Sequence, residues 1–439
     1  MLDIKFIREN VEAIAEAAKN KNIKIDLERL LKVDENRRIL IAGLEEIQAQ
    51  RNEIAKSAQG GRPTDDQITQ GKKIKIEANE IEEQLKKIEF EYNELMVLVP
   101  TIPAEDVPVG KDESGNVEIE KNGEPTKFDF EPKDHMQLGK DLDIIDFERG
   151  VKVSGYRGYY MKNEGVHLQM ALMMYALEKL VAKGFMPMIP PTLVKEYVLF
   201  GSGYFAGKNF NEEEDEVYKI ANKEIEADGK SNKEDKFLIG TAEPALLAYH
   251  SGETLDVKQL PLKMCGFSPC YRSEIGSYGK DAKGLYRVHE FMKVEQVCFC
   301  EADVEKAEKL HREMLEISKE LHREIGLPYR VLEICTGDMS AGKYRMFDLE
   351  AWMPSREGYG ETGSASNFLD WQSRRLNVRY KDAEGKKKHV FMLNNTAIPS
   401  PRFIIAILEN FQQADGSVLI PKVLQKYMPG NIKEIKKDK

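Results

Sequence analysis

The chain has 439 residues, of which 41 % are hydrophobic and 32 % are charged, so it is long enough for two or three domains with sizeable cores. Its 65 basic and 75 acidic side chains give a net charge of −10, which argues against a surface that coats nucleic acid throughout but allows a local basic patch. No run reaches the length of a membrane span, and the charged N-terminus lacks the apolar core of a signal peptide, so we expect a cytoplasmic protein without membrane contact.

Two long helices are predicted near the N-terminus, after an amphipathic helical stretch in residues 1–20. Mostly apolar residues recur at spacings of three and four between 30 and 54 and again between 74 and 99, with a Gly- and Pro-containing break between the two runs. These heptads predict an antiparallel coiled-coil hairpin at about 30–99, within a helical arm at 1–105. The predicted seam consists of Leu30, Val33, Arg37, Leu40, Leu44, Ile47, Arg51, Ile54, Ile74, Ala78, Ile81, Leu85, Ile88, Tyr92, Leu95 and Val99.

The tip of this hairpin, QAQRNEIAKSAQGGRPT, is polar and basic. Heptads commonly serve dimerisation, but here the two helices of one chain can bury each other's apolar seams. The tip is then free to contact an anionic partner. Arg51, Lys56 and Arg62 are the candidate phosphate contacts, and the alternative is that they are solvated surface charges.

A Pro-rich segment, VPTIPAEDVPVG, ends the arm and predicts a linker, which we place at 106–120. Helices and strands mix in the following domain, at 121–439. A polar insertion at 211–236 interrupts that domain and is expected to be a surface hairpin or a mobile loop.

The cysteines predict reduced core thiols. Their number is five, so full disulfide pairing is impossible, and the gap of four residues between Cys265 and Cys270 does not match the usual spacing of paired zinc ligands. We therefore expect no zinc. His311 and His322 lie in a charged helical stretch and are expected at the surface.

Residues 270–296, CYRSEIGSYGKDAKGLYRVHEFMKVEQ, form two extended runs around a Gly-containing loop. Side chains two apart on a strand share a face, so Arg272 and Glu274 lie together on the first run. One face of the second run carries Arg287, His289, Phe291, Lys293 and Glu295. Opposite charges beside an aromatic ring favour a cleft for a ligand with anionic and cationic parts, since Arg suits phosphate and a carboxylate suits an ammonium. The alternative is an exposed hairpin with a solvated face.

This hairpin resembles motif 2 of the class II aminoacyl-tRNA synthetases, and three further segments extend the resemblance. GFMPMIPPTLV at 184–194 is similar to motif 1, LNNTAIPSPRFIIAILENFQ at 393–412 is similar to motif 3, and LIGTAEPALLAYHSGE precedes the hairpin with Thr-Ala-Glu. With GETGSASNFLDWQSRRLNVRY between motifs 2 and 3, and a helical hairpin in front, the whole chain resembles the seryl-tRNA synthetase family.

The resemblance implies an α+β fold, in which the coiled-coil hairpin is followed by a catalytic domain built on an antiparallel sheet flanked by helices. It implies a homodimer formed through motif 1. It also implies a reaction in which serine and ATP give seryl-adenylate and pyrophosphate, after which serine passes to tRNA(Ser), and to tRNA(Sec) where that tRNA is present. The implied cofactors are ATP and Mg²⁺, without zinc.

Family roles carry over to individual positions. Arg272 and Arg402 are the implied catalytic residues, with Arg272 offsetting charge at the α-phosphate of ATP. Glu361 is also the implied magnesium ligand, acting through ATP. The implied ATP-binding residues are Arg272, Ser273, Glu274, Arg287, Val288, Phe291, Glu361, Thr362, Gly363, Ser364 and Arg402. The implied serine-binding residues are Thr241, Ala242, Glu243, Glu295, Asn394 and Thr396.

Two other functions compete with this one. The first is a synthetase-like enzyme that activates an amino acid and loads a carrier protein, but such relatives lack the long N-terminal arm. The second is a coiled-coil interaction protein with an inactive catalytic domain. Such a domain would be expected to have lost some of four residues that are all present here: Arg272, Glu295, Glu361 and Arg402.

Overall fold

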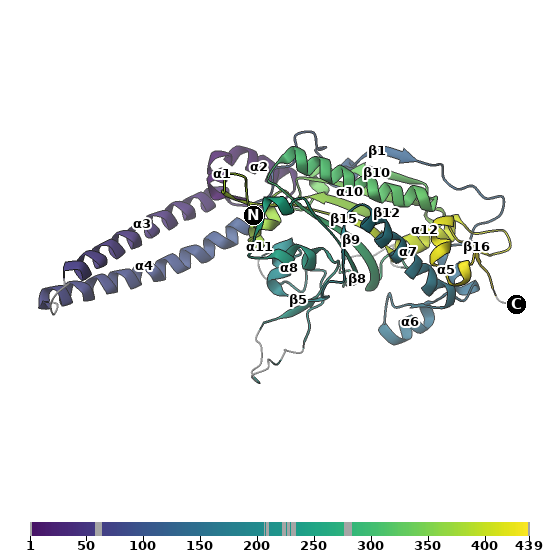
Figure 1. The fold of residues 1–439 in the computed structure, drawn as a ribbon, viewed down its shortest axis with the longest axis horizontal. Coiled ribbons are helices and arrows are strands. Elements are labelled where there is room, and N and C mark those ends of the chain that lie inside the picture. The colour runs from purple at the N-terminus through teal and green to yellow at the C-terminus, as the bar shows by residue number, and fades with distance from the viewer. Residues whose placement is uncertain are drawn as a thin grey trace. The chain divides into compact units, whose positions relative to one another are not determined.

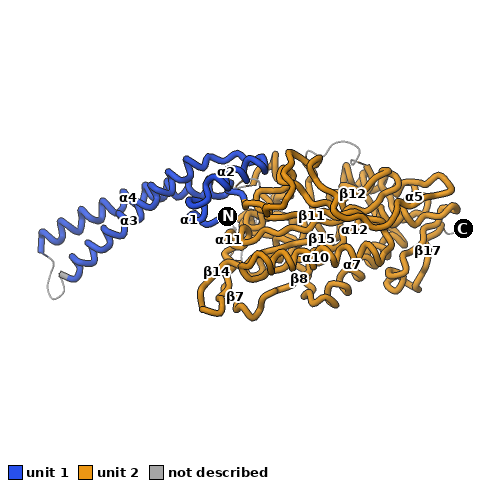
Figure 2. The backbone as a smooth tube through the Cα atoms, turned by 90° about the horizontal axis from the view of Figure 1, so that it is seen from above, with its two compact units in different colours: residues 1–100 blue, residues 101–439 orange. Residues whose placement is uncertain are grey.

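The computed structural model describes residues 2–57, 64–205, 207, 210–221, 225, 229, 234–275 and 283–437. The chain divides into two compact units, residues 1–100 and residues 101–439 (Figure 2). Within the described residues, no helix is both long enough and apolar enough to cross a membrane.

The first unit contains the predicted helical hairpin, formed by α3 (Leu27–Ser57) and α4 (Asp65–Val97), after the short helices α1 (Ile4–Glu9) and α2 (Val11–Asn20) (Figure 1). Ion pairs between the long helices show that they are antiparallel, because residue numbers rise along one as they fall along the other. Arg29 pairs with Glu91 at 2.6 Å, and Arg37 pairs with Glu89 at 3.3 Å.

The predicted seam lies between these helices. Leu30, Val33, Ile47 and Ile74 are buried, and most other seam positions are half-buried. The guanidinium of Arg37 lies 5.0 Å from the centre of the Tyr92 ring, so this polar seam position is filled by a cation–π contact. The predicted coiled-coil hairpin is thereby confirmed.

The second unit is built on an eight-stranded sheet in the order β1-β10-β11-β12-β15-β9-β8-β4. Every neighbouring pair is antiparallel except β4 and β8, which confirms the predicted antiparallel sheet. The strands are β1 (Val117–Asn122), β4 (Met186–Met188), β8 (Leu262–Tyr271), β9 (Glu290–Cys300), β10 (Tyr329–Glu333), β11 (Arg345–Met353), β12 (Gly358–Asn367) and β15 (Phe391–Pro399).

The two faces of the sheet are covered differently. The largest core cluster joins one face to the helices α7 (Asn163–Ala182), α10 (Val304–Ile325) and α12 (Ser400–Asn410). A smaller cluster covers part of the other face with α9 (Glu243–Leu247) and α11 (Trp371–Leu376). Successive side chains of a strand alternate between faces, so the odd-numbered residues of β9 lie on this second face.

Smaller elements complete the second unit. They are α5 (His135–Asp141), β2 (Ile145–Asp146), α6 (Phe147–Ser154), β3 (Tyr160–Met161), β5 (Leu193–Lys195), α8 (Glu196–Ser202), β6 (Lys236–Leu238), β7 (Thr254–Asp256), β13 (Arg379–Lys381), β14 (Lys387–His389), β16 (Val418–Leu419) and β17 (Glu434–Ile435). In the insertion at 211–236, the described part pairs with β6 through an isolated bridge between Lys219 and Phe237.

The segment expected to be a linker, 106–120, is part of the second unit. Asp106 forms an ion pair with Arg345, and Val107 is buried in a small apolar cluster with Ile334. Strand β1 then forms one edge of the large sheet. Proline content indicated a linker, but apolar residues between the prolines give the segment a surface to bury.

The expectation that His311 and His322 are surface residues is wrong, because both are fully buried on α10. His311 follows Ala307 by four positions and precedes Met314 by three, which places it on the apolar stripe of the helix. Burial lowers the pKa of both histidines to about 4.

Candidate functional site

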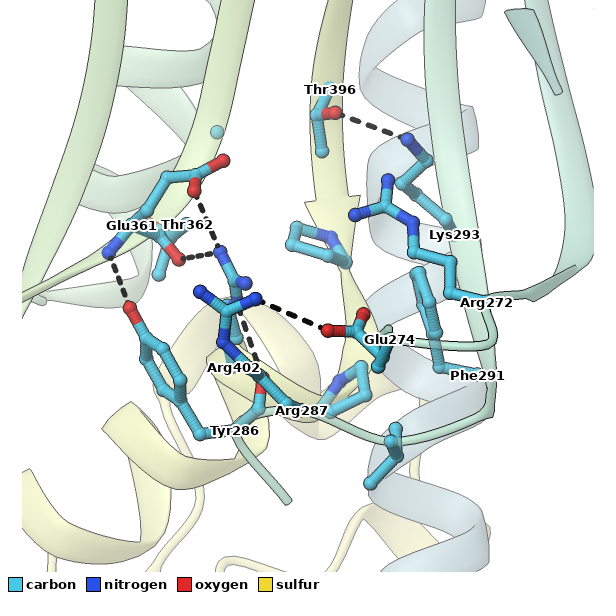
Figure 3. Close-up of a pocket in the computed structure, with 14 residues that line it drawn as sticks. Arg272, Glu274, Tyr286, Arg287, Phe291, Lys293, Glu361, Thr362, Thr396 and Arg402 are labelled. Atoms are coloured by element: carbon cyan, nitrogen blue, oxygen red, sulfur yellow. Dashed lines mark hydrogen bonds and ion pairs between the residues drawn. The ribbon is translucent and has the colours of Figure 1, made fainter. Parts of the chain in front are cut away.

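A pocket opens on the second face of the large sheet, where the strands carry charged side chains (Figure 3). It holds about 470 Å³ of empty space, counting the part open to solvent. It is lined by Arg272, Glu274, Tyr286, Arg287, Val288, Phe291, Lys293, Glu361, Thr362, Gly363, Thr396, Pro399, Pro401 and Arg402.

Arg272 enters the pocket just after β8 ends. Its Nε donates to the Gly240 carbonyl oxygen at 3.2 Å, and its guanidinium lies 5.5 Å from the centre of the Phe291 ring. The main chain is fixed as well, because the Arg272 carbonyl lies 2.9 Å from Nδ1 of His289. The terminal guanidinium nitrogens therefore sit at the end of a side chain that is held along its length, as a preorganised anion-binding group requires.

Glu274, which follows β8, and Arg287, which precedes β9, face each other in the pocket (Figure 3). Their side chains pair at 3.2 Å, and only 8 % of Glu274 is exposed. Glu274 has a φ of 52°, in the left-handed region that side-chain-bearing residues seldom adopt. Such a conformation costs about 1–3 kcal/mol and persists where surrounding contacts enforce it, as at ligand sites.

Glu361 and Arg402 form the opposite wall, next to Tyr286 (Figure 3). Arg402 Nη1 lies 3.0 Å from Glu361 Oε2 and also donates to the Glu361 carbonyl oxygen at 2.9 Å. Burial acts to raise the pKa of Glu361, but the Arg402 guanidinium, together with the charges of Arg272 and Lys343, holds that pKa below its usual value.

A buried polar cluster centres on Glu295, which is 2 % exposed. Three donors converge on its Oε2: Lys293 Nζ at 2.6 Å, the Thr396 hydroxyl at 3.1 Å and the Thr241 hydroxyl at 3.2 Å. Lys293 also donates to the Thr396 hydroxyl at 3.3 Å. These three donors hold the Glu295 carboxylate in one orientation.

Glu243 is a second buried carboxylate in the same region. Its Oε1 accepts hydrogen bonds from Asn394 at 2.8 Å and from Gln372 at 2.9 Å. Burial and, second, the nearby Glu295 carboxylate raise the pKa of Glu243 to about 7, against the lowering effect of the hydrogen bond from Gln372. Glu243 therefore changes charge near neutral pH, while the polar hydrogens around it keep it oriented.

The structure brings most of the residues implied by the resemblance together, with three exceptions. Ala242 is packed in the smaller core cluster, and Ser273 and Ser364 are not among the lining residues. At the arm, Arg51 and Lys56 are exposed on α3, and Arg62 lies outside the described residues.

Sequence reasoning assigned no role to Tyr286, Lys293 or Gln372. Lys293 had a signal, since it shares a strand face with Phe291 and Glu295. Tyr286 precedes the regular strand, and Gln372 lies far from Glu243 in the sequence, so neither contact follows from local spacing.

The metal-binding capacity of the site rests on carboxylates. Among the described residues there is no group of three or more His, Cys, Asp and Glu side chains arranged to hold a metal ion. Glu361 faces the pocket, and the pKa of Asp348 is raised well above its usual value, first by burial and then by the Glu361 charge.

Comparisons with known proteins match both units. The family model described as the seryl-tRNA synthetase N-terminal domain matches residues 1–103, and the model of the class II core domain of synthetases for G, H, P, S and T matches residues 218–411. A serine–tRNA ligase of Treponema denticola is 44 % identical over 97 % of this chain and 98 % of its own. One of Deinococcus radiodurans is 42 % identical over 98 % of both chains. The chain belongs to the seryl-tRNA synthetase family.

Solved structures agree with this family. The crystal structure of seryl-tRNA synthetase from Pyrococcus horikoshii complexed with ATP matches with a TM-score of 0.87, at 38 % identity over 100 % of both chains. The cytoplasmic serine–tRNA ligase of Naegleria fowleri in complex with AMP gives 0.85 at 31 % identity, over 100 % of this chain and 99 % of its own. The predicted seryl-tRNA synthetase fold is confirmed over the whole chain.

Proposed function

We propose that this seryl-tRNA synthetase activates serine with ATP and transfers it to tRNA(Ser). The observation that carries the proposal is one pocket in which guanidinium groups and an aromatic ring adjoin two buried carboxylates, Glu243 and Glu295, in a chain that matches serine–tRNA ligases over nearly its full length. This chain matches both the N-terminal domain model of seryl-tRNA synthetases and the class II core model, which disfavours carrier loading and an inactive interaction protein.

The ATP roles are assigned to the outer part of the pocket. Arg272 binds the α-phosphate and offsets the charge that builds there as the serine carboxylate attacks phosphorus and pyrophosphate leaves. Phe291 stacks on adenine and Glu274 accepts from its amino edge, while Arg287 and Arg402 bind the phosphate tail. The positions of these five side chains around one pocket support the assignment.

The serine roles are assigned to the buried part. Glu243 and Glu295 provide negative charge for the ammonium and an acceptor for the hydroxyl, and Thr241, Asn394 and Thr396 orient them. Lys293, between this cluster and the pocket, is suited to contact the reacting carboxylate, because it already bridges Glu295 and Thr396.

Magnesium fits this site as an ion carried in with ATP. Mg²⁺ bound to phosphates needs one or two protein carboxylates, and Glu361 supplies one at the pocket wall. Bound there, the ion would neutralise phosphate charge, and Glu361 would hold it in register with Arg402. No zinc is expected in the serine site.

The tRNA is assigned to the arm, where Arg51 and Lys56 are exposed on α3 and Arg62 is placed by the sequence alone. Long-range contact with phosphates needs exposed cations on a rigid support, and a coiled-coil hairpin provides one. By the same recognition, tRNA(Sec) is a second substrate where it is present.

A homodimer is also proposed, through motif 1 and the preceding helix. The outer side of α7 exposes apolar residues one turn apart, with Val166 41 % exposed, Met170 40 % and Met174 47 %. Ile189, in motif 1, is 81 % exposed. Contiguous exposed apolar surface of this kind marks protein interfaces. Sedimentation of the wild type and of Met174→Glu tests it, with a dimer expected for the former and a monomer for the latter.

The test of the catalytic proposal is amino-acid-dependent ATP–pyrophosphate exchange with all twenty amino acids. Serine should be preferred, and alanine should be rejected by about 10⁴-fold, because the site's polar groups would be left without partners. Arg272→Ala should lower the exchange rate by about 10²–10³ with the circular dichroism spectrum unchanged. Preference for another amino acid would overturn the assignment.

A further inference from the structure

Strand β12 parts from β15 beside the pocket. The two strands pair only at Ala365, Ser366 and Asn367, so the earlier residues of β12 have no ladder on that side. On the other side, the pairing with β11 shifts register between Leu349 and Glu350, next to Glu361. Both polar groups of the Glu361 backbone therefore need partners other than a regular strand.

Side chains supply those partners. The Tyr286 hydroxyl accepts the Glu361 N–H at 3.1 Å, and Arg402 Nη1 donates to the Glu361 carbonyl at 2.9 Å (Figure 3). Tyr286 and Arg402 also bind each other. The Arg402 Nε donates to the Tyr286 carbonyl at 3.3 Å, and its guanidinium lies 4.5 Å from the centre of the Tyr286 ring.

The ring of Tyr286 contacts a second guanidinium, since Arg356 lies 4.2 Å from its centre. Aromatic faces attract guanidinium groups and hold them more firmly when water is excluded. Tyr286 is thus the shared contact of the Arg402 guanidinium and the Glu361 backbone, which belong to one wall of the pocket.

We infer that Tyr286 is a positioning residue for ATP: it stands in for the missing strand pairing at Glu361 and fixes the guanidinium of Arg402. The inference rests on the proposed function, in which Glu361 and Arg402 bind the phosphates and their magnesium ion. The ring positions the Arg402 guanidinium, and the hydroxyl positions the Glu361 backbone. Substitutions that remove the hydroxyl alone, or the ring as well, should therefore have different effects.

Tyr286→Phe removes the hydroxyl and keeps the ring, and Tyr286→Leu removes both. In pyrophosphate exchange, Tyr286→Phe should raise the KM for ATP by up to about tenfold, the usual effect of one lost hydrogen bond. Tyr286→Leu should raise it further, since the ring–guanidinium contact is lost too, and the KM for serine should stay unchanged in both. Tyr359→Leu is the matched control, because the Tyr359 ring also contacts a guanidinium, that of Arg330 at 5.0 Å, but Tyr359 lies on β12 and does not line the pocket.

A combined variant tests whether Tyr286 acts through Arg402. In an Arg402→Ala background, Tyr286→Leu should raise the KM for ATP much less than it does in the wild type. The reason is that the effects of substituting two residues that act as a unit are not additive. Equal rises in the KM for ATP and for serine, a Tyr286→Phe variant with wild-type kinetics, or additive losses would each overturn the inference. Absence of exchange in the wild-type enzyme would instead overturn the proposed function.

Discussion

Arg402 holds Glu361 at two points, its backbone carbonyl at 2.9 Å and its carboxylate at 3.0 Å. The pair lies at the pocket wall, and the guanidinium keeps the Glu361 pKa below its usual value against the effect of burial. Glu361 is therefore charged at neutral pH and oriented by Arg402, which is what a ligand for a phosphate-bound metal ion requires.

Glu361→Gln should keep the shape of this wall and lose its charge. We expect the exchange rate to fall by about 10²-fold at moderate MgCl₂, as for loss of one preorganised charged group. The MgCl₂ concentration needed for half-maximal rate should rise as well. Glu350→Gln is the control, since Glu350 pairs in register with Glu361 but forms its ion pair with Arg330, outside the pocket. Equal loss in both variants would mean that the effect is structural.

The raised pKa of Glu243 predicts that kcat/KM for serine depends on pH. Its pKa is raised to about 7, so the carboxyl is neutral below that pH and charged above it. The serine ammonium is attracted only by the charged form, so kcat/KM for serine should rise with pH through an inflection near 7, and Glu243→Gln should remove the inflection. The KM for ATP should not show it. An inflection that survives in the variant would assign the titration to another group.

Removal of the arm should separate serine activation from tRNA charging. Among the described residues, none that is assigned to the active site precedes Thr241, so removal of residues 1–100 should leave pyrophosphate exchange near the wild-type rate and lose most of the tRNA charging. Loss of both activities would make the arm a folding element.

In the full chain, the double variant Arg51→Glu/Lys56→Glu should weaken tRNA binding and flatten its salt dependence, because fewer counterions are released. The control pair Lys24→Glu/Lys32→Glu carries the same charge change near the start of α3. If both pairs act alike, only the net charge of the arm matters.

The buried histidines predict loss of stability in acid. Burial lowers the pKa of His311 to about 4, whereas an unfolded histidine has a pKa of about 6.5. The unfolded chain therefore binds the proton first, and the free energy of unfolding should fall as the pH drops, by about 2 kcal/mol between pH 7 and pH 5 for this residue. His311→Phe, which keeps a ring against Phe347, should weaken that dependence in urea denaturation. A variant with an unchanged pH dependence would contradict the assignment.

Patterns with a short period were predictable from the sequence. The heptads located the arm, and alternation along β9 placed Phe291 and Glu295 on one face. Tertiary relationships were not predictable. The contact of Gln372 with Glu243 joins residues 129 positions apart, and the role of Tyr286 depends on where β12 leaves β15. The error at the histidines came from weighing the charges of α10 above its apolar stripe.

The five cysteines are all buried and unpaired. Burial raises the pKa of Cys265 and Cys300 to about 12, so these thiols stay protonated as well as shielded at neutral pH. The native protein therefore offers few reactive thiols to a maleimide reagent. A single cysteine placed at an exposed arm position, such as Gln48 or Glu53, would take up a fluorophore selectively, and the arm's engagement with a partner could then be followed by anisotropy without first removing the natural thiols.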